Sequence, residues 1–164
     1  MSSWLWPTTA DVGMRVFAAS FPKLLSEASY GMQHYLMSPK AMAALNVHVR
    51  STGEWRVRSH HNPKDHSFLF LAWLDEVLYR AEVHEQWLVE AMVQIFEDEI
   101  GLEAIVQASW VDAKLIEREI EIKAITTHQL RVEEVLSNQS VLSRWEDVPS
   151  FDGPGWYADV VFDI

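Results

Sequence analysis

Residues 66–80 read His66-Ser67-Phe68-Leu69-Phe70-Leu71-Ala72-Trp73-Leu74-Asp75-Glu76-Val77-Leu78-Tyr79-Arg80, a run that is apolar on nearly every side of a helix. Asp65 precedes it as an N-cap, because its carboxylate can accept a hydrogen bond from a free backbone N–H in the first turn. A helix that is apolar on all sides is buried by its neighbours. We therefore expect residues 66–80 to lie at the centre of the fold.

The regions on either side predict one further helix and several strands. Apolar residues recur at three- and four-residue spacing over Phe21–Met37, which predicts an amphipathic helix. Gly53 is expected to turn a strand at 45–49 into a second strand at 55–58, as a hairpin. Further strands are predicted at 13–19, 87–96, 104–111, 119–133 and 157–164. Two helices among about seven strands, without strand–helix–strand alternation, predict an α+β fold with a largely antiparallel β-sheet.

The composition is that of one globular domain spanning residues 1–164, with 49% hydrophobic and 23% charged residues. The absence of cysteine excludes disulfides, thiolate zinc sites, iron–sulfur clusters and a cysteine nucleophile. Eight tryptophans predict a large aromatic core or an exposed docking surface. The sequence contains no run apolar enough for a membrane span and begins without the features of a secretory signal. We expect a cytoplasmic protein that makes no membrane contact.

Acidic residues outnumber basic ones. The 13 Lys and Arg residues against 24 Asp and Glu residues give a net charge of −11 with neutral histidine. Binding to a nucleic-acid backbone needs clustered cations, so any work on nucleic acid is expected to pass through a basic protein partner. High solubility is the other explanation of this charge.

Two acidic segments stand out, one near each end of the chain. Asp11 lies directly before a predicted strand, and Asp163 lies beside Ile164, whose α-carboxylate is a further anionic oxygen donor if the chain ends there. Together these groups would make an all-oxygen site, which suits Ca²⁺, Mg²⁺ or Mn²⁺ and not zinc. An ordinary turn residue and a solvated, frayed terminus are the alternatives. The sequence alone does not bring Asp11 near Asp163.

Three further polar residues are candidates for a functional role. Lys123 lies between isoleucines, either as a side chain that extends from the core edge to water or as a cation aimed at carboxylates or phosphate. On a strand, Lys123, Ile125 and Thr127 share one face, and His128 lies on the other. Asp75 falls on an apolar arc of its helix, where a carboxylate is costly unless it is paired or functional.

Other groups of residues give weaker evidence of a functional site. His60, His61 and His66 fit no zinc spacing, and a polar loop before the helix is the better interpretation. The sequence contains no Gly-rich phosphate loop, no Gly-x-Ser-x-Gly and no His-Glu-x-x-His motif, and no nucleophile with an obvious base. It therefore does not support an enzymatic activity of its own.

Four motifs, in order along the chain, together resemble the archease family. They are Thr8-Thr9-Ala10-Asp11-Val12-Gly13, Leu71-Ala72-Trp73-Leu74-Asp75-Glu76-Val77-Leu78-Tyr79, Lys123-Ala124-Ile125-Thr126-Thr127-His128 and Trp156-Tyr157-Ala158-Asp159-Val160-Val161-Phe162-Asp163-Ile164. The chain differs from the family patterns at Thr8 and Thr127, where the family has His and Tyr. The resemblance implies a single archease-like domain in which a curved, largely antiparallel β-sheet packs with two α-helices.

The resemblance also implies a function. Archeases are accessory proteins of the RtcB-type RNA ligase, which joins a cyclic-phosphate or 3′-phosphate RNA end to a 5′-hydroxyl end through a guanylylated histidine, with GTP and Mn²⁺. This chain would promote guanylylation and multiple turnover of such a ligase in tRNA splicing or RNA repair, and would contact RNA only through the ligase. The implied metal ligands are Asp11, Asp163 and the terminal Ile164, with calcium favoured and magnesium or manganese as alternatives. Residues that would support the function are Lys123, Asp75 and His128.

Two other classes of protein remain open. A general chaperone or protein-assembly module would act through an exposed Trp-rich surface and would not depend on Asp11. A metal-dependent hydrolase would use Asp11, Asp163 and His128, and it is the weakest interpretation because no nucleophile-and-base pair accompanies them.

Overall fold

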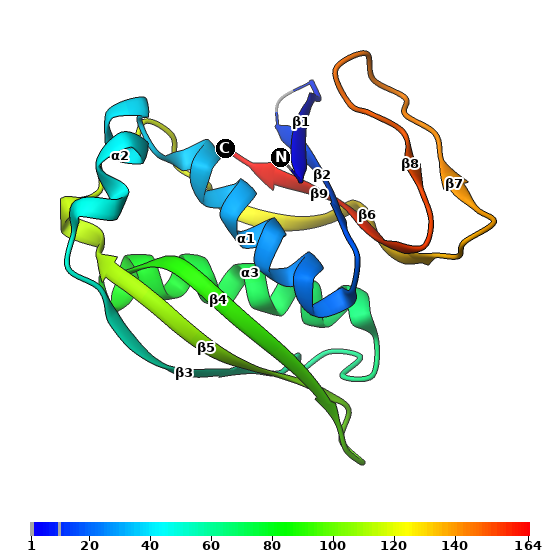
Figure 1. The fold of residues 1–164 in the computed structure, drawn as a ribbon, viewed down its shortest axis with the longest axis horizontal. Coiled ribbons are helices and arrows are strands. Elements are labelled where there is room, and N and C mark those ends of the chain that lie inside the picture. Colours follow the sequence, from blue (N-terminus) through cyan, green and yellow to red (C-terminus); the bar gives the residue numbers. More distant parts are fainter. Residues whose placement is uncertain (1, 10) are drawn as a thin grey trace.

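The computed structural model describes residues 2–9 and 11–164 (Figure 1). Its helices are α1 (Phe21–Leu36), α2 (Pro39–Ala44) and α3 (His66–Val83), with the short 3-10 helices η1 (Leu45–Val47) and η2 (Ala113–Leu115). Its strands are β1 (Ser3–Pro7), β2 (Val12–Ala18), β3 (Ser51–Val57), β4 (Gln86–Glu97), β5 (Leu102–Asp112), β6 (Ala124–Val135), β7 (Ser140–Val141), β8 (Phe151–Asp152) and β9 (Gly155–Asp163).

The strands form two main sheets, and every neighbouring pair within them is antiparallel. One sheet has the order β1-β2-β9-β6 and the other the order β3-β5-β4, while β7 and β8 pair only with each other. Helices α1 and α3 lie between the two main sheets and pack against both (Figure 1). The predicted α+β fold with antiparallel pairing is confirmed, but there are two main sheets instead of one and a third, short helix, α2.

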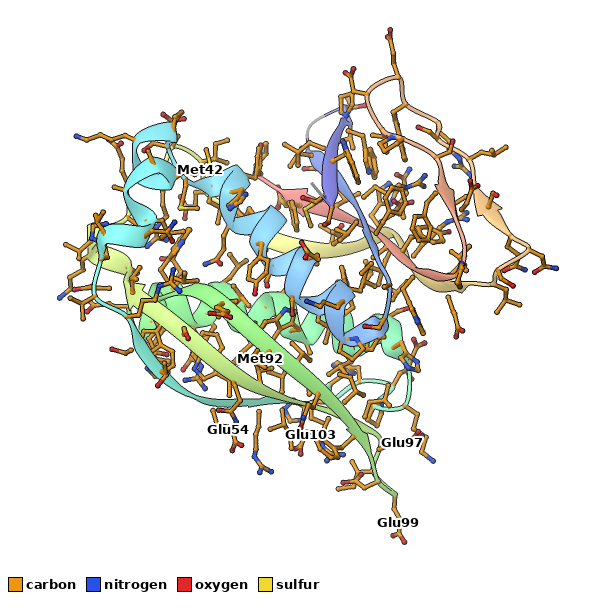
Figure 2. The ribbon with its side chains drawn as sticks, viewed as in Figure 1. Met42, Glu54, Met92, Glu97, Glu99 and Glu103 are labelled. Atoms are coloured by element: carbon orange, nitrogen blue, oxygen red, sulfur yellow. The ribbon has the colours of Figure 1, made fainter. Side chains whose placement is uncertain are left out.

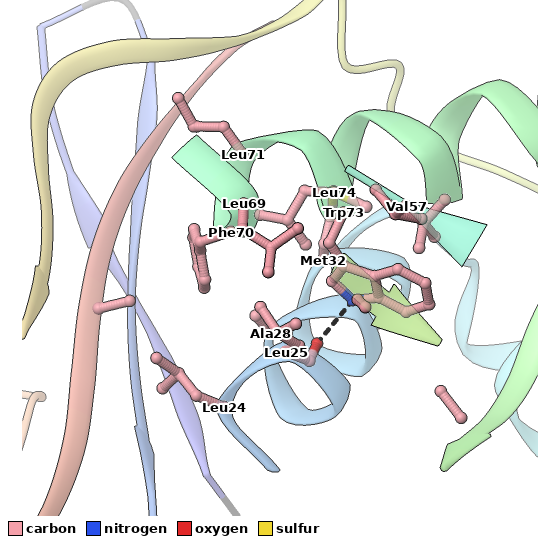
Figure 3. Close-up of a cluster of buried hydrophobic side chains, with 14 of the residues drawn as sticks. Leu24, Leu25, Ala28, Met32, Val57, Leu69, Phe70, Leu71, Trp73 and Leu74 are labelled. Atoms are coloured by element: carbon pink, nitrogen blue, oxygen red, sulfur yellow. Dashed lines mark hydrogen bonds between the residues drawn. The ribbon is translucent and has the colours of Figure 1, made fainter. Parts of the chain in front are cut away.

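Helix α3 lies at the centre of the core, as its sequence predicts. Phe70 and Trp73 are fully buried, and the Trp73 indole N–H donates a hydrogen bond of 2.8 Å to the Leu25 carbonyl of α1 (Figure 3). The Asp65 carboxylate accepts a hydrogen bond of 2.8 Å from the Ser67 N–H, which confirms the predicted cap. Each large apolar side chain buried here contributes about 1.5–3 kcal/mol. In the described part of the chain, no helix is long and apolar enough to cross a membrane.

The eight tryptophans serve the interior of the protein. Four are buried and the other four are half-buried, so none belongs to the exposed class. Of the two roles predicted for them, the aromatic core is therefore the one that the structure favours, because an exposed Trp-rich surface is not present. The four buried residues are Trp6, Trp55, Trp73 and Trp87.

Side chains of α1 close part of the edge of β4. The Ala91 N–H donates to the Tyr30 hydroxyl at 2.8 Å, and the Ser26 hydroxyl donates to the Ala91 carbonyl at 3.0 Å. An edge strand leaves a row of backbone groups unpaired, and buried ones must find partners. These polar residues of α1 therefore fix the helix against the three-stranded sheet.

The prediction of a hairpin around Gly53 is wrong. Residues 45–47 form η1, and Gly53 lies inside β3, opposite Ala108 of β5. A Cβ at Gly53 would lie 2.8 Å from the Trp110 ring, so this glycine makes room for an indole and not for a turn. The glycine was interpreted as a turn residue because the close approach of Trp110 leaves no signal in the neighbouring sequence.

Other boundaries also differ from the predicted ones. Strand β6 begins at Ala124 instead of residue 119, because the preceding segment is irregular and touches the rest of the protein through a Met37–Arg118 bridge. Four elements, β1, α2, β7 and β8, were not predicted from the sequence. These elements are at most six residues long, which is too short for hydrophobic periodicity to show.

The segment 136–154, called the arm below, packs on the outer face of the four-stranded sheet, which is the face that points away from α1 and α3 (Figure 1). Trp145 of the arm stacks on Trp6 with ring centroids 4.4 Å apart. Phe151 stacks on Phe17 at 4.7 Å. These aromatic contacts hold a segment with little regular structure against the sheet.

Beneath the arm, Arg15 of β2 and Asp159 of β9 form a bidentate ion pair with both N–O distances at 2.7 Å. Their side chains are only 4% and 7% exposed. The guanidinium lies 5.0 Å from the centre of the Trp145 ring and donates to the Leu142 carbonyl. The pair therefore joins the two central strands and ties the arm to them.

Replacing Arg15 with alanine should lower the free energy of unfolding by about 3–5 kcal/mol, because Asp159 would be left as an unpaired charge in a buried site. The matched control is Arg56→Ala, whose exposed ion pairs with Glu54 and Glu103 predict a change of at most about 1 kcal/mol. Urea unfolding followed by tryptophan fluorescence measures both. Equal effects of the two substitutions would contradict the buried pair's role.

Candidate functional site

Asp11 and Asp163 come together through the pairing of β2 with β9. The register pairs Val12 with Phe162, and continuing it by one position sets Asp11 opposite Asp163. Opposite residues of an antiparallel pair project their side chains from the same face. Both residues are half-buried, and they lie at one end of the four-stranded sheet.

Lys123 approaches the same end from the other side of β9. Its backbone N–H donates a hydrogen bond of 2.8 Å to the Asp163 carbonyl, and the next residue, Ala124, pairs with Asp163 in the sheet. Ile164 follows directly and is 38% exposed. Three separate parts of the chain therefore meet at what we call the carboxylate edge, formed by Asp11, Lys123, Asp163 and Ile164.

A local turn presents Asp11 at this edge. The Asp11 N–H donates to the Thr8 hydroxyl at 2.9 Å, a side-chain bond that stabilises a turn before the strand begins. Thr8 stands where the archease pattern has histidine. In this chain the residue therefore positions the backbone of Asp11.

A hollow of about 520 Å³ opens beside the carboxylate edge, on the outer face of the sheet. His128 lines it from a part of β6 that is irregular: the register with β9 shifts between Thr126 and Arg131, and Gln129 has a φ of 56°. The His128 N–H donates to the Thr126 hydroxyl at 3.2 Å. This outer hollow is lined by Trp6, Pro7, Thr8, Thr9, Asp11, His128, Gln129, Arg144 and Trp145.

Arg144 and Trp145 are two of the lining residues that were not predicted from the sequence. Both belong to the arm, and Trp145 is held there by its stacking on Trp6. The only sequence feature that could have indicated these two residues is a tryptophan next to an arginine in a segment without helix or strand periodicity. It could not be used, because nothing in the sequence indicates which part of the fold the arm covers.

The oxygen donors of the carboxylate edge match hard divalent cations such as Ca²⁺, Mg²⁺ and Mn²⁺. The side chains of residues 2–9 and 11–164 contain no cluster of three His, Cys, Asp or Glu residues arranged for a metal ion. A third anionic ligand would therefore have to be the α-carboxylate that Ile164 carries when it ends the protein. Metal binding by this edge stays a prediction.

The three histidines before and within α3 do not converge. His66 packs edge-on against Phe21 at 4.7 Å and lies 5.2 Å from the Trp156 ring, where it completes an aromatic cluster. His60 and His61 lie in the loop after β3 and line a different groove. This separation agrees with the interpretation of the segment as a polar loop.

Asp75 lies away from the carboxylate edge, in a groove of about 750 Å³ on the opposite face of β6. We call this cavity the α3 groove. The residues that line it are Arg56, Val57, Arg58, Ser59, His60, His61, Phe68, Leu71, Ala72, Asp75, Glu76, Tyr79, Ile125 and Thr127. Asp75 is exposed at the rim of this groove, yet desolvation by the surrounding apolar side chains raises the pKa of its carboxyl above the ordinary value. Ile125 and Thr127 face this groove while His128 faces the outer hollow, as their alternation predicts.

These observations define an α+β protein of two antiparallel sheets around two helices, with a carboxylate edge where β2, β9 and the start of β6 meet. The model of the Archease protein family (MTH1598/TM1083) matches residues 5–164, so the chain belongs to the archease family.

One solved structure shows the same fold. It is the solution structure of Methanobacterium thermoautotrophicum protein 1598, which is 20% identical, with 99% of each chain covered and a TM-score of 0.65. No curated protein matches the sequence.

Replacing Asp75 with asparagine should raise the free energy of unfolding at pH 7. Because the folded-state pKa of Asp75 is raised, the folded protein binds this proton more tightly than the unfolded chain, and stability falls as the pH rises through the two pKa values. The carboxylate is therefore a net cost at neutral pH, and the difference between wild type and variant should close at a pH below the ordinary aspartate pKa. Urea unfolding at several pH values measures this; a variant less stable than wild type at pH 7 would contradict it.

Proposed function

We propose that this protein is an accessory protein of an RtcB-type RNA ligase, which it activates by promoting guanylylation and multiple turnover in tRNA splicing or RNA repair. The observation that carries the proposal is the β2–β9 register, which sets Asp11 opposite Asp163 at the end of β9 in a chain of the archease family. These are the residues that the family resemblance marks as metal ligands.

The carboxylate edge would act by entering the cationic, metal-containing site of the ligase. Asp163 is the last residue of β9, and Asp11 is tied to Thr8 by a backbone-to-side-chain hydrogen bond directly before β2, so both carboxylates lose little freedom on binding. There they could hold a divalent cation or organise the phosphates of GTP. Calcium is the favoured resident ion of this proposal, and magnesium or manganese are the alternatives with the same oxygen preference.

Lys123 would balance the negative charge of this edge. Its backbone is fixed next to Asp163 by a hydrogen bond, while its side chain lines a groove with Leu36, Leu78 and Glu82 on the helix side of the sheet, so the ammonium group would have to swing around the end of the strand to reach the carboxylates or a bound phosphate. His128 and Arg144 face the neighbouring outer hollow and would add donors for a phosphate there. They therefore have a supporting part in this proposal.

The net charge of −11 supports docking on a basic enzyme, because opposite charges steer association. The same charge disfavours direct binding of a nucleic-acid backbone. In this proposal the protein contacts RNA only through the ligase, works in the cytoplasm and catalyses no reaction by itself. A general chaperone would need an exposed Trp-rich surface, which the burial of the tryptophans does not supply.

Stimulation of the ligase should depend on the carboxylate edge. With an RtcB-type ligase from the same source, the wild-type protein should accelerate nucleotide transfer from GTP, and Asp11→Ala or Asp163→Ala should abolish that stimulation, since each removes an anionic ligand. The measurement is formation of labelled ligase–guanylate.

The matched control is Glu134→Ala, which removes an exposed carboxylate near the other end of β6, opposite Trp156. It should stimulate like wild type. Full stimulation by both aspartate variants would refute the role of the edge, and no stimulation by the folded wild-type protein would refute the accessory function altogether.

In a protein that ends at Ile164, adding one alanine after it should weaken metal binding at least tenfold, because the addition converts the α-carboxylate into a neutral amide. Terbium luminescence is a suitable probe, since Trp6 and Trp145 line the hollow next to Asp11 and can sensitise the ion. Calcium competition then gives the affinity. If the extended protein bound the metal ion as tightly as wild type while Asp11→Asn lost binding, the ligands would be side chains alone.

A further inference from the structure

The α3 groove is a second candidate site, distinct from the carboxylate edge. Figure 1 shows α3 between β6 on one side and β3 on the other, and residues of all three elements line the groove. Along its floor, Phe68, Ala72, Asp75 and Tyr79 follow one another at spacings of four, three and four residues. This spacing places them on one face of the helix over three turns, a length of about 16 Å.

Both walls of the groove are sheet edges. Strand β3 is the first strand of the three-stranded sheet, and β6 is the last strand of the four-stranded sheet. An edge strand carries backbone N–H and C=O groups that its single neighbour does not use. Such groups pair readily with an added extended chain, which is a common mode of peptide recognition.

The charges around the groove leave one carboxylate uncompensated. Glu76 accepts from Arg80 at 2.7 Å. Arg58 holds Asp98 through two bonds of 2.8 Å and so keeps the pKa of that carboxyl well below its usual range. Arg56 also lines the groove and pairs with Glu54 and Glu103. Asp75, in contrast, is exposed and has no hydrogen bond or ion pair within the described chain.

Apolar surface lies on both sides of Asp75. Phe68 is half-buried toward one end of the stripe, and Tyr79 is 49% exposed toward the other. Ile125 of β6 completes the apolar lining. A ligand that fits this pattern carries a cation flanked by apolar groups, and it must be narrow enough to lie between two strands.

We propose that the α3 groove binds an extended segment of a partner protein, about five residues long, in which a lysine or arginine pairs with Asp75 and flanking apolar side chains pack on Phe68 and Tyr79. The length follows from a rise of about 3.3 Å per residue in an extended chain against the 16 Å stripe. This site is independent of the carboxylate edge, because the two lie on opposite faces of β6.

A phage-displayed library of random linear heptapeptides, selected on the full-length protein, tests the proposal. The recovered peptides should be enriched in a lysine or arginine with apolar neighbours. A synthetic peptide of the consensus sequence, titrated into ¹⁵N-labelled protein, should shift amide signals along α3, at Phe68, Ala72 and Tyr79, and in β6 at Thr127. Asp75→Asn should weaken its binding about tenfold or more, since a charge-assisted hydrogen bond is lost.

Two matched variants separate this site from other acidic surface. Glu134→Gln removes an exposed carboxylate outside the groove, and Asp11→Ala alters the carboxylate edge; both should bind the consensus peptide like wild type. Recovery of no peptide, absence of cation enrichment, equal binding by Asp75→Asn, or signal shifts confined to the outer hollow would each overturn the proposal.

Discussion

The antiparallel pairing of β2 with β9 is the constraint on which the rest of the structure depends. It joins residues from the two ends of the chain and fixes a single register, because a slip of one position would turn Met14 and Val16 out of the core. The same register sets Arg15 against Asp159 under the arm and Asp11 against Asp163 at the sheet's end. A structural ion pair and a candidate functional pair are thus two consequences of one alignment.

Strand β6 shows how one element serves two surfaces. Ile125 and Thr127 face the α3 groove, whereas His128 faces the outer hollow beyond a register shift. A regular strand would keep pairing with β9 past Thr126. The irregular stretch around Gln129, with its positive φ, frees His128 from that ladder and brings it to the hollow shared with Asp11. The irregular stretch therefore adds His128 to a hollow whose position the β2–β9 pairing sets.

Sequence reasoning succeeded where one local pattern dominates and failed where distant contacts decide. The apolar run of α3 and its Asp65 cap could be predicted because both signals lie within a few residues of each other. Gly53 was misjudged because its role depends on Trp110, far along the chain. The meeting of Asp11 and Asp163 could be suspected from their chemistry, but only the strand register places them together. Arg144 was missed because the position of the arm depends on stacking between Trp6 and Trp145.

The distribution of charge explains why these two sites stand out on an acidic protein. On the three-stranded sheet, Arg56 and Arg58 pair with Glu54, Asp98 and Glu103, so part of the negative charge there is locally balanced. Glu97 and Glu99, at the far end of the same sheet (Figure 2), have no ion pair among the described residues. Such exposed pairs contribute little stability, and many other carboxylates of this acidic chain have no ion pair among the described residues. At Asp75 the surroundings raise the pKa of the carboxyl, so its ionised form carries a cost in folding free energy. A residue that folding alone would not favour is best explained by a ligand that supplies the missing cation, because partner binding can offset a cost that the free protein carries.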